Sequence, residues 1–567
     1  MNQKTLTAQE IFSKYDKGYN FNSQINLYDT VQVNENFFIG NQWEGVEANG
    51  LPTPTFNMMK QVVNFQVSTI TSDNMVLQAS PMPCMGRKLP KEVERVCKIV
   101  SDQYTGIMER NRIVTKMREF MRNAAVDGDG CMHFWFDSSV ENGQLVKGEI
   151  AAEVLENTRV HFGNPNSREV QAQPYIIIVR REILEDVRWR AEQLMESDAC
   201  GLTNLDEIKA DSDKFQTRYD SYTDDKVTVL TYYYRDRKSG NIWCAEAVDA
   251  GMLRKPYDTG YTMYPLIWQS WDYVQDCYHG QAMITGLLPN QKFVNKMFAM
   301  VGISLTTSAF PKIIYDSTKI KSWDGSVGSA VGIHGNVDGV AKTIEGASVN
   351  PQIGQFMELC IDKTKSFLGA SDVALGDSRP DNTSAIIALQ RAANTPMEMT
   401  KQGMYQQIED MGKIWCDMMA AKYGTRVVST TMDMDIAGQQ PLGMQLPMQQ
   451  FEEEFDFGTL REFTLSVKQD AGASSYWSEI ASMQTLDNLL MNKQITLLQY
   501  LERVPAGYIS KKQELIDEIK APMAAPASVT GAGATGGSFG VPNIENMPVA
   551  GGPGNGALQR ALNQTGV

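Results

Sequence analysis

The feature that most constrains the fold of this chain is a pair of helical segments on either side of a glycine-punctuated stretch. Residues 281–309 and 351–369 each carry apolar side chains at the steps expected for a helix with one apolar face. The stretch between them, residues 310–350, has short strand-like pieces and is repeatedly interrupted by glycine. We therefore expect two helices joined by a small β-rich unit, followed by a loop of small and polar residues at 370–384.

Helix and strand patterns alternate along the rest of the chain, which predicts an α+β fold that is mainly helical. A single long helix is predicted over 90–125, and a glycine turn separates it from the apolar strand 131–136. Residues 227–243 have the pattern of a β-hairpin. Another long helix is predicted over 384–423, with a bend at Pro396.

The two ends of the chain have weaker patterns. Residues 1–90 mix polar loops with short apolar pieces, and one helix is predicted there after the capping residue Asn57. Residues 521–567 consist largely of Gly, Ala, Pro and Asn, so they bury too little apolar surface to offset the cost of ordering. We expect a disordered tail. Many of the 31 methionines fall in predicted helices; methionine suits interfaces that repack, although a methionine stripe is more often core.

The chain is acidic, with 52 Lys and Arg against 67 Asp and Glu and a formal net charge of −15. General nucleic-acid-binding proteins need clustered positive charge, so this class is disfavoured. An acidic chain could still suit a conduit through which a polyanion slides without sticking. Solubility alone explains the charge more simply.

Nothing in the sequence predicts secretion or membrane insertion. The first residues lack a basic flank followed by an apolar block, and the longest apolar-leaning run, 297–311, is shorter than the ~20 residues of a membrane helix. The eight cysteines are scattered without a CxxC pair, which predicts reduced, mostly buried thiols in a cytosolic product.

The sequence contains no recognisable enzyme motif. Gly412-Lys413 is followed by Ile414 rather than Ser or Thr, so it is not a phosphate-binding loop, and no Gly-x-Ser-x-Gly elbow occurs. The four histidines form no metal-binding motif, and His133, inside an apolar strand, is predicted to be a hydrogen-bonded core residue rather than a ligand. We predict no catalytic residue, no cofactor and no metal. The loop acids could in principle hold a divalent ion, but such acids are usually solvated; they are Asp372, Asp377 and Asp381.

The order of these segments resembles that of the portal proteins of tailed bacteriophages over roughly residues 30–520. The predicted helix that ends at VDGDG and enters CMHFWF is similar to the wing of that family, and so is the segment RVHFGNPNSREVQAQPYIIIVRRE. The array at 281–384 carries the most weight, because it resembles a stem helix, a clip, a returning stem helix and a channel loop. The segment TLSVKQDAGASSYWSEIASMQTLDNLLMNKQITLLQYLERVP is similar to the closing part of such portals.

The resemblance implies a division of the chain into the parts of a portal subunit. They are an N-terminal wing (1–280), a stem helix (281–309), a β-rich clip (310–350), a second stem helix (351–369), a channel loop (370–384), a wing helix with strands (385–473), short crown-like C-terminal helices (474–520) and a disordered tail (521–567). The glycine-rich tail differs from the long helical crown of some portals.

The resemblance also implies a function and partners. The chain would form a homo-oligomeric ring, typically a dodecamer, at one capsid vertex of the virion, after synthesis in the host cytoplasm. Double-stranded DNA would pass through the ring during packaging and ejection without being read by sequence. The implied partners are terminase, the major capsid or scaffolding protein, and head-completion or tail adaptor proteins, with no membrane.

Five cations are candidates for contacts with this DNA, because one residue per subunit becomes a belt of positive charge in a ring. Taken singly, each is as readily explained as a surface residue or an intersubunit ion-pair partner. Arg379 is the best candidate, because it sits in the loop expected to reach the channel. The candidates are Arg379, Lys363, Lys365, Lys292 and Lys296, and the named loop residues are Ser371, Asp372, Gly376, Asp377 and Asp381.

Two other readings stay open. The chain could be another ring-forming structural protein of a virion, or a subunit of a secretion ring, without DNA passage. It could also be an enzyme with an unfamiliar site, which the absence of motifs disfavours. Electron-microscope images would separate these two hypotheses from the portal hypothesis, because only a portal requires closed rings with a hole wide enough for duplex DNA.

Overall fold

The computed structural model describes a large part of the chain, mainly before residue 470. The described residues are 6–47, 52–73, 75–82, 91–212, 225–309, 312–320, 322, 333, 336, 338–344, 352–367, 397–431, 450–463, 465–469, 486–487, 489–491, 494–497, 500–501 and 504. The tail predicted at 521–567 lies outside them. Residues 505–520 of the predicted C-terminal helices and residues 384–396 at the start of the predicted wing helix also lie outside them.

The chain divides into two compact units. The first comprises Met1–Asp435 and Leu446–Ile495, and the second comprises Ile436–Gln445 and Thr496–Val567. All the labelled helices and strands belong to the first unit.

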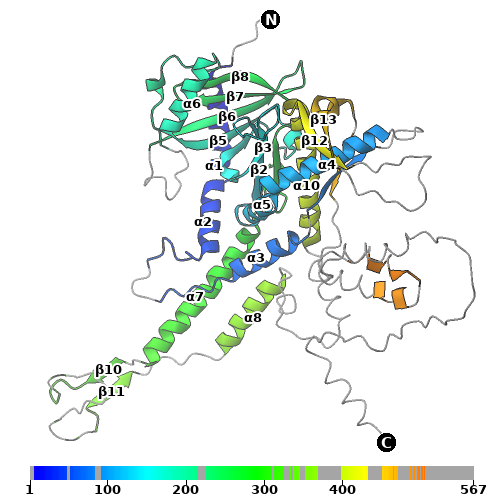
Figure 1. Cartoon of the computed structure of the whole chain (residues 1–567). Coiled ribbons are helices and arrows are strands. Elements are labelled where there is room, and N and C mark those ends of the chain that lie inside the picture. The colour runs from blue at the N-terminus through cyan, green and yellow to red at the C-terminus, as the bar shows by residue number, and fades with distance from the viewer. Residues whose placement is uncertain are drawn as a thin grey trace, which may run out of the picture. The chain divides into compact units, whose positions relative to one another are not determined.

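The first unit is built from helices and several small antiparallel sheets, which confirms the predicted α+β class (Figure 1). The helices are α1 (Ala8–Gln24), α2 (Leu27–Ile39), α3 (Met58–Ile70), α4 (Lys91–Arg110), α5 (Ile113–Asp127), α6 (Leu184–Glu196), α7 (Met283–Ala309), α8 (Gln352–Phe367) and α10 (Glu398–Lys422). The strands are β1 (Leu77–Pro81), β2 (Asp129–Asp137), β3 (Glu149–Leu155), β4 (Val160–Phe162), β5 (Tyr175–Ile183), β6 (Lys226–Arg235), β7 (Ile242–Val248), β8 (Gly251–Tyr261), β9 (Leu266–Ser270), β10 (Lys312–Tyr315), β11 (Ala341–Ile344), β12 (Thr425–Thr431), β13 (Gln450–Asp456) and β14 (Leu465–Gln469).

The largest sheet is a five-stranded meander in the order β4-β5-β6-β7-β8, covered on both faces. Its strand β5 contains the apolar run 176–179, and alternate residues of that run belong to different cores. Ile176 and Ile178 face the main core, whereas Ile177 and Val179 pack with the apolar face of α1. A strand buried on both faces needs this uninterrupted apolar sequence, because successive side chains point to opposite sides.

The main core lies around α10 and the three-stranded sheet, whose order is β3-β2-β9. Trp415 of α10 is fully buried and meets Phe134 of β2 edge-to-face, with ring centroids 5.8 Å apart. The Tyr104 hydroxyl of α4 donates to the Gly412 carbonyl of α10 at 2.9 Å. Because β1 pairs with β14, segments far apart in the sequence close over the same core.

The prediction of one helix over 90–125 was wrong, because the chain breaks between α4 and α5. Arg112 adopts a left-handed conformation with φ 52°, which ends one helix and begins the next. The neighbouring Asn111 side chain explains the break: its amide donates to the Ile150 carbonyl at 2.8 Å and accepts from the Ala152 amide at 3.0 Å. Asn111 therefore pairs with the backbone of β3 as another strand would.

The N-terminal segment is more helical than its sequence pattern predicts. Helices α1 and α2 occupy a region expected to be mostly loops, and they are separated by Asn26 in a left-handed conformation, φ 54°. Gly18 lies inside α1 where a Cβ atom would come within 2.9 Å of His161. The glycine that weakens the helical pattern is thus required by close packing.

Several local predictions are confirmed. The predicted hairpin consists of β6 and β7, and β10 pairs with β11 inside the predicted glycine-punctuated unit. Four of the seven cysteines that the structure describes are buried. His133 is buried, with Nδ1 3.1 Å from Glu153 and Nε2 3.1 Å from the Tyr233 hydroxyl, as expected for a hydrogen-bonded core histidine.

Candidate functional site at helices α7 and α8

Helix α7 has a buried half and an exposed half. Its first turns pack against α2, α3 and α5, where Ile284 and Val294 are buried. From Lys296 to Ser308, none of the described side chains of this helix is buried. The sequence pattern predicts this helix correctly, but its mean apolarity does not reveal that the second half extends beyond the core.

The buried half of α7 is held in register by amide side chains. Gln291 donates to the Phe56 carbonyl at 2.7 Å and to Asn295 at 2.9 Å, and Asn295 donates to Gln42 at 2.6 Å. Gln291 and Asn295 are at most 2% exposed, so these bonds form away from water, where an unpaired amide is costly. The network bonds α7 to Gln42 and to Phe56. Apolar periodicity in the sequence does not predict these contacts.

Helix α8 packs against α7 and carries exposed apolar side chains of its own. Phe293 of α7 meets Phe356 of α8 edge-to-face, and Asn290 donates to Thr364 at 3.3 Å. Large apolar side chains nevertheless remain open to solvent on both helices. Those with the greatest exposure are Met300 at 49%, Leu305 at 60%, Phe356 at 49% and Leu359 at 51%.

The structure describes the side chains of three of the five cationic residues predicted to contact DNA. Lys292 and Lys296 are exposed one turn apart on the same face of α7, and Lys363 is exposed on α8. Helix α7 contains no Asp or Glu, and within the described residues none of these three lysines forms an ion pair. The Lys292 ammonium lies 5.4 Å from the ring centroid of Phe37.

The other predicted site residues cannot be placed. Lys365 belongs to α8, but its side chain is outside the described part of the chain. Arg379 and the loop residues Ser371, Asp372, Gly376, Asp377 and Asp381 also lie outside it. The roles of these residues stay predictions.

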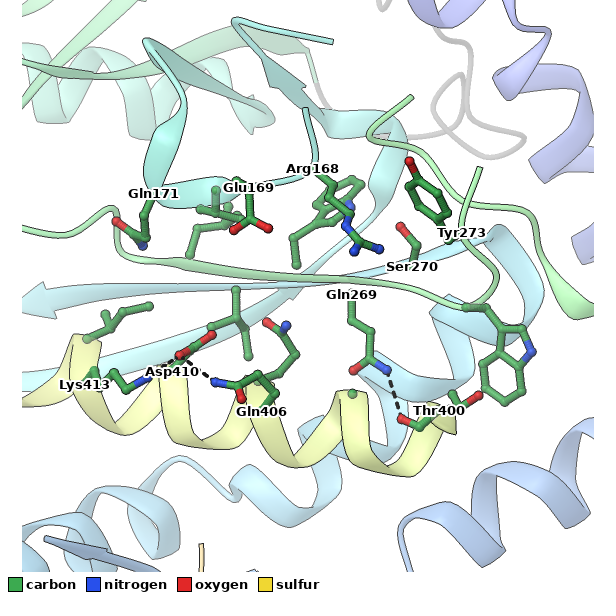
Figure 2. A pocket seen from close by; sticks show the side chains of 18 of the residues that line it. Arg168, Glu169, Gln171, Gln269, Ser270, Tyr273, Thr400, Gln406, Asp410 and Lys413 are labelled. Atoms are coloured by element: carbon green, nitrogen blue, oxygen red, sulfur yellow. Dashed lines mark hydrogen bonds and ion pairs between the residues drawn. The ribbon is translucent and has the colours of Figure 1, made fainter. Parts of the chain in front are cut away.

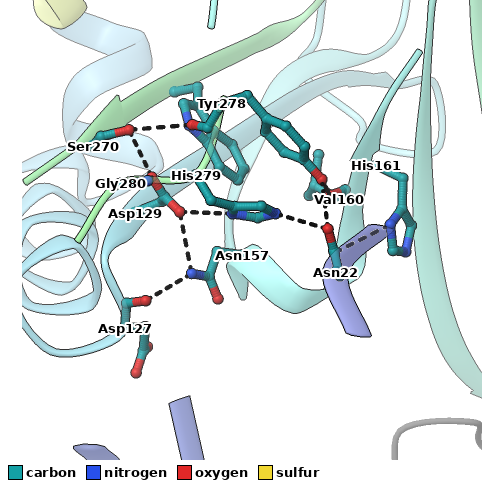
Figure 3. A network of polar contacts seen from close by, with 11 residues as sticks. Asn22, Asp127, Asp129, Asn157, Val160, His161, Ser270, Tyr278, His279 and Gly280 are labelled. Carbon is teal, nitrogen blue, oxygen red and sulfur yellow. Dashed lines mark hydrogen bonds and ion pairs between the residues drawn. The ribbon is translucent and has the colours of Figure 1, made fainter. Parts of the chain in front are cut away.

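The base of α7 is fixed by a buried polar network that the sequence pattern does not reveal (Figure 3). Asp129, at the start of β2, accepts hydrogen bonds from the Gly280 amide at 2.8 Å and from the Ser270 hydroxyl at 2.7 Å. His279 lies between Asp129, 2.8 Å from its Nδ1, and Asn22 of α1, 3.1 Å from its Nε2. The segment that leads into α7 is therefore bonded to β2 and α1 together.

Close backbone packing adds to this anchor. Gly128, the C-cap of α5, has φ 105°, and a Cβ atom there would come within 2.8 Å of the Gly280 carbonyl oxygen. Tyr278 is fully buried, and its hydroxyl lies 3.2 Å from Asn22 and 3.1 Å from the Val160 carbonyl. The glycine turn that the sequence marks as a helix stop is thus also a contact surface for the base of α7.

The network suits positioning rather than proton transfer to a substrate. The far nitrogen of His279 faces an amide oxygen of Asn22, where a catalytic histidine would face a nucleophile or substrate. On the other side of Asn22 lies His161, 3.4 Å away, and burial lowers the pKa of His161 to about 3. Burial, followed by the nearby Glu35 charge, raises the pKa of Asp127 beside the network.

The described residues contain no group of three or more His, Cys, Asp or Glu side chains arranged to hold a metal ion. Within the same residues, no helix is both long enough and apolar enough to cross a membrane.

A comparison with models of known protein families gives a match. Residues 175–454, which run from β5 into β13, match the family model described as Phage P22-like portal protein. This range includes α7, β10, β11, α8 and α10. No curated protein matches the chain.

Proposed function

Because the chain belongs to the P22-like portal protein family of bacteriophages, we propose that it is the ring-forming subunit of the channel for DNA packaging and ejection. The proposed assembly is a homo-oligomer, a dodecamer by analogy with the family, at one capsid vertex of the virion. In this proposal α7 and α8 are the stem helices, and β10 and β11 belong to the clip. The N-terminal helices and sheets form the wing, and the proposed role is structural rather than enzymatic.

The observation that carries this proposal is the exposed half of α7. Met300 and Leu305 are large apolar side chains that an isolated subunit would leave in water, which favours association with another surface. Copies of one chain around a rotational axis would repeat this surface at every interface. A ring therefore supplies the missing contacts without a second kind of protein.

The charge of α7 fits a channel for DNA. Two lysines without any acidic residue make this helix positive, although the whole chain has a net charge of −15. Repeated in every subunit, Lys292 and Lys296 form belts that attract phosphates without reading bases. The acidic remainder of the chain limits nonspecific retention of DNA.

The proposed partners follow from this role. Terminase would dock on the clip during packaging, and head-completion or tail adaptor proteins would replace it afterwards. The major capsid or scaffolding protein would hold the wing in the shell. These partners are inferred from the family alone.

Electron microscopy of the purified full chain tests the proposal. We expect closed rings with a central hole wide enough for duplex DNA. Rings with a narrow or plugged hole would favour a virion structural protein without DNA passage, and uniform monomers would contradict the ring itself.

The role of the α7 lysines is tested by the double variant Lys292→Ala/Lys296→Ala in assembling phage. We expect intact rings but a severalfold lower yield of DNA-filled particles, because the positive belts are lost. The matched control is Lys147→Ala/Lys255→Ala, which removes one exposed lysine from the loop between β2 and β3 and one from β8. Equal packaging by both double variants would argue against a channel role for α7.

A further inference from the structure

A cleft of about 680 Å³ runs along β9, away from the stem helices (Figure 2). The segment 168–171 forms one wall and the first half of α10 forms the other, with β9 between them. The match of the chain to portal proteins assigns no role to this cleft.

The backbone of β9 has one free edge in this cleft. The order β3-β2-β9 makes β9 an edge strand, and no described strand pairs with its other side. The bonds from Phe134 N to Pro265 O and from Trp271 N to Gly128 O fix which residues point toward β2. Since backbone groups alternate in direction along a strand, Trp268 and Ser270 direct their N–H and C=O groups away from β2.

One side chain already binds this edge as a peptide would. Tyr264 precedes β9 and shares the outward direction of Trp268 and Ser270. The Gln171 amide accepts from the Tyr264 N–H at 2.8 Å and donates to the Tyr264 C=O at 3.1 Å. The same pair of contacts is available to an incoming backbone at Trp268 and Ser270.

The walls are rich in neutral hydrogen-bonding groups. Gln269 is 8% exposed and donates to the Thr400 carbonyl at 3.2 Å, while its oxygen has no partner among the described residues. Gln406 and Lys413 both bind Asp410, at 3.2 and 2.7 Å, so the charges of Asp410 and Lys413 on this wall are paired with each other. Amide groups that both donate and accept match a peptide backbone, whereas a polyanion would need surplus positive charge.

One end of the cleft offers apolar anchors. Tyr273 is 61% exposed with the Arg168 guanidinium 4.6 Å from its ring centroid, and Met399 is 84% exposed. Both residues line the cleft. An apolar side chain of an extended segment would be covered here.

We propose that this cleft binds an extended segment of another virion polypeptide, which adds as a strand to β9. The identity of the partner as a virion protein rests on the proposed portal function. The backbone groups of Trp268 and Ser270 supply the recognition, and one apolar residue of the segment packs on Tyr273 and Met399. At ~3.4 Å per residue, a segment as long as the five residues of β9 spans ~17 Å.

The test places a photo-cross-linking amino acid at Gln406 in the full chain, expressed in cells that assemble the phage. Mass spectrometry of purified particles then identifies the cross-linked segment. Hydrogen exchange at the amides of Trp268 and Ser270 is compared between particles and isolated rings. We expect one dominant cross-link to a different polypeptide, and exchange slowed by about tenfold or more at both amides.

A filling variant and its control complete the test. Gln407→Trp narrows the cleft and is expected to reduce the cross-link about tenfold. Gln402→Trp, exposed on the same helix but outside the cleft, is expected to leave it unchanged. Cross-links only to another copy of this chain, or unchanged exchange in particles, would overturn the proposal. Absence of rings in the isolated protein would instead count against the portal function.

Discussion

Asp129 is a single buried carboxylate that bonds the start of β2 to the segment at the base of α7. It accepts hydrogen bonds from His279, Ser270, Gly280 and Asn157, and it has no exposed surface. In Asp129→Asn, an amide NH2 group replaces one acceptor oxygen and faces N–H or O–H donors, so those buried donors lose their acceptor. We expect the free energy of unfolding to fall by about 3–5 kcal/mol in urea denaturation followed by tryptophan fluorescence.

The same substitution at an exposed site provides the control. Asp198 is 98% exposed and paired with Lys255, so Asp198→Asn should leave the free energy of unfolding nearly unchanged. A similarly small effect at Asp129 would show that the network does not hold the base of α7.

His161 predicts a loss of stability in mild acid. Burial, and next the neighbouring His279, lower its pKa to about 3, whereas the pKa of an unfolded histidine is about 6.5. The unfolded chain therefore binds a proton first, and the stabilisation, full above about pH 6.5, declines as the pH falls toward 3. Between pH 6.5 and 5 this residue alone removes about 2 kcal/mol.

Unfolding measured across that pH range tests the role of His161. The variant His161→Gln should show a clearly smaller pH dependence between pH 6.5 and 5 than the wild type. Burial lowers the pKa of His133 as well, so part of the dependence will remain. Glu153, whose pKa is about 2 because His133 and Arg180 bind its carboxylate, contributes in the same direction only below about pH 4.5. Equal slopes for the variant and the wild type would contradict the assignment.

At the scale of elements, the break between α4 and α5 depends on a strained residue. Arg112 has φ 52°, a conformation that costs a residue with a Cβ atom about 1–2 kcal/mol and costs glycine little. Arg112→Gly should therefore leave the midpoint of thermal unfolding unchanged or raise it. Arg118→Gly, at an exposed position inside α5, should lower stability by about 1 kcal/mol. Comparable losses in both variants would contradict the strain assigned to Arg112.

Helices and strands in which apolar residues recur at regular spacing were predicted well. Helices α7 and α8 and strands β5 and β6 have clear apolar patterns, and the structure shows them close to the expected bounds. Helices α1 and α2 were missed because Gly18 and several polar residues interrupt their apolar faces. The break at Arg112 was missed because its cause, the pairing of Asn111 with β3, involves residues about forty positions away.

At the scale of the whole molecule, the exposed half of α7 predicts an interface between subunits. Met300→Glu combined with Leu305→Glu places charges on a surface that ring assembly would bury. We expect a folded chain with an unchanged circular dichroism spectrum but far fewer rings, measured by size-exclusion chromatography with light scattering.

An exposed leucine elsewhere is the matched control. Leu145 is 88% exposed between β2 and β3, and Leu145→Glu should leave ring formation intact. Rings formed at the wild-type level by the Met300/Leu305 double variant would rule out α7 as an assembly surface.

The sequence by itself determined the α+β class, the two helices on either side of a glycine-punctuated unit, and the resemblance to portal proteins. Those conclusions rest on local periodicity and on the order of segments, which neighbouring residues specify. Only the tertiary structure decided that Asp129, His279 and Asn22 meet at the base of α7, that α7 leaves half its length outside the core, and that β9 has a free edge. These features depend on contacts between residues more than a hundred positions apart, and no local pattern encodes which distant groups will satisfy a buried polar atom or cover a strand.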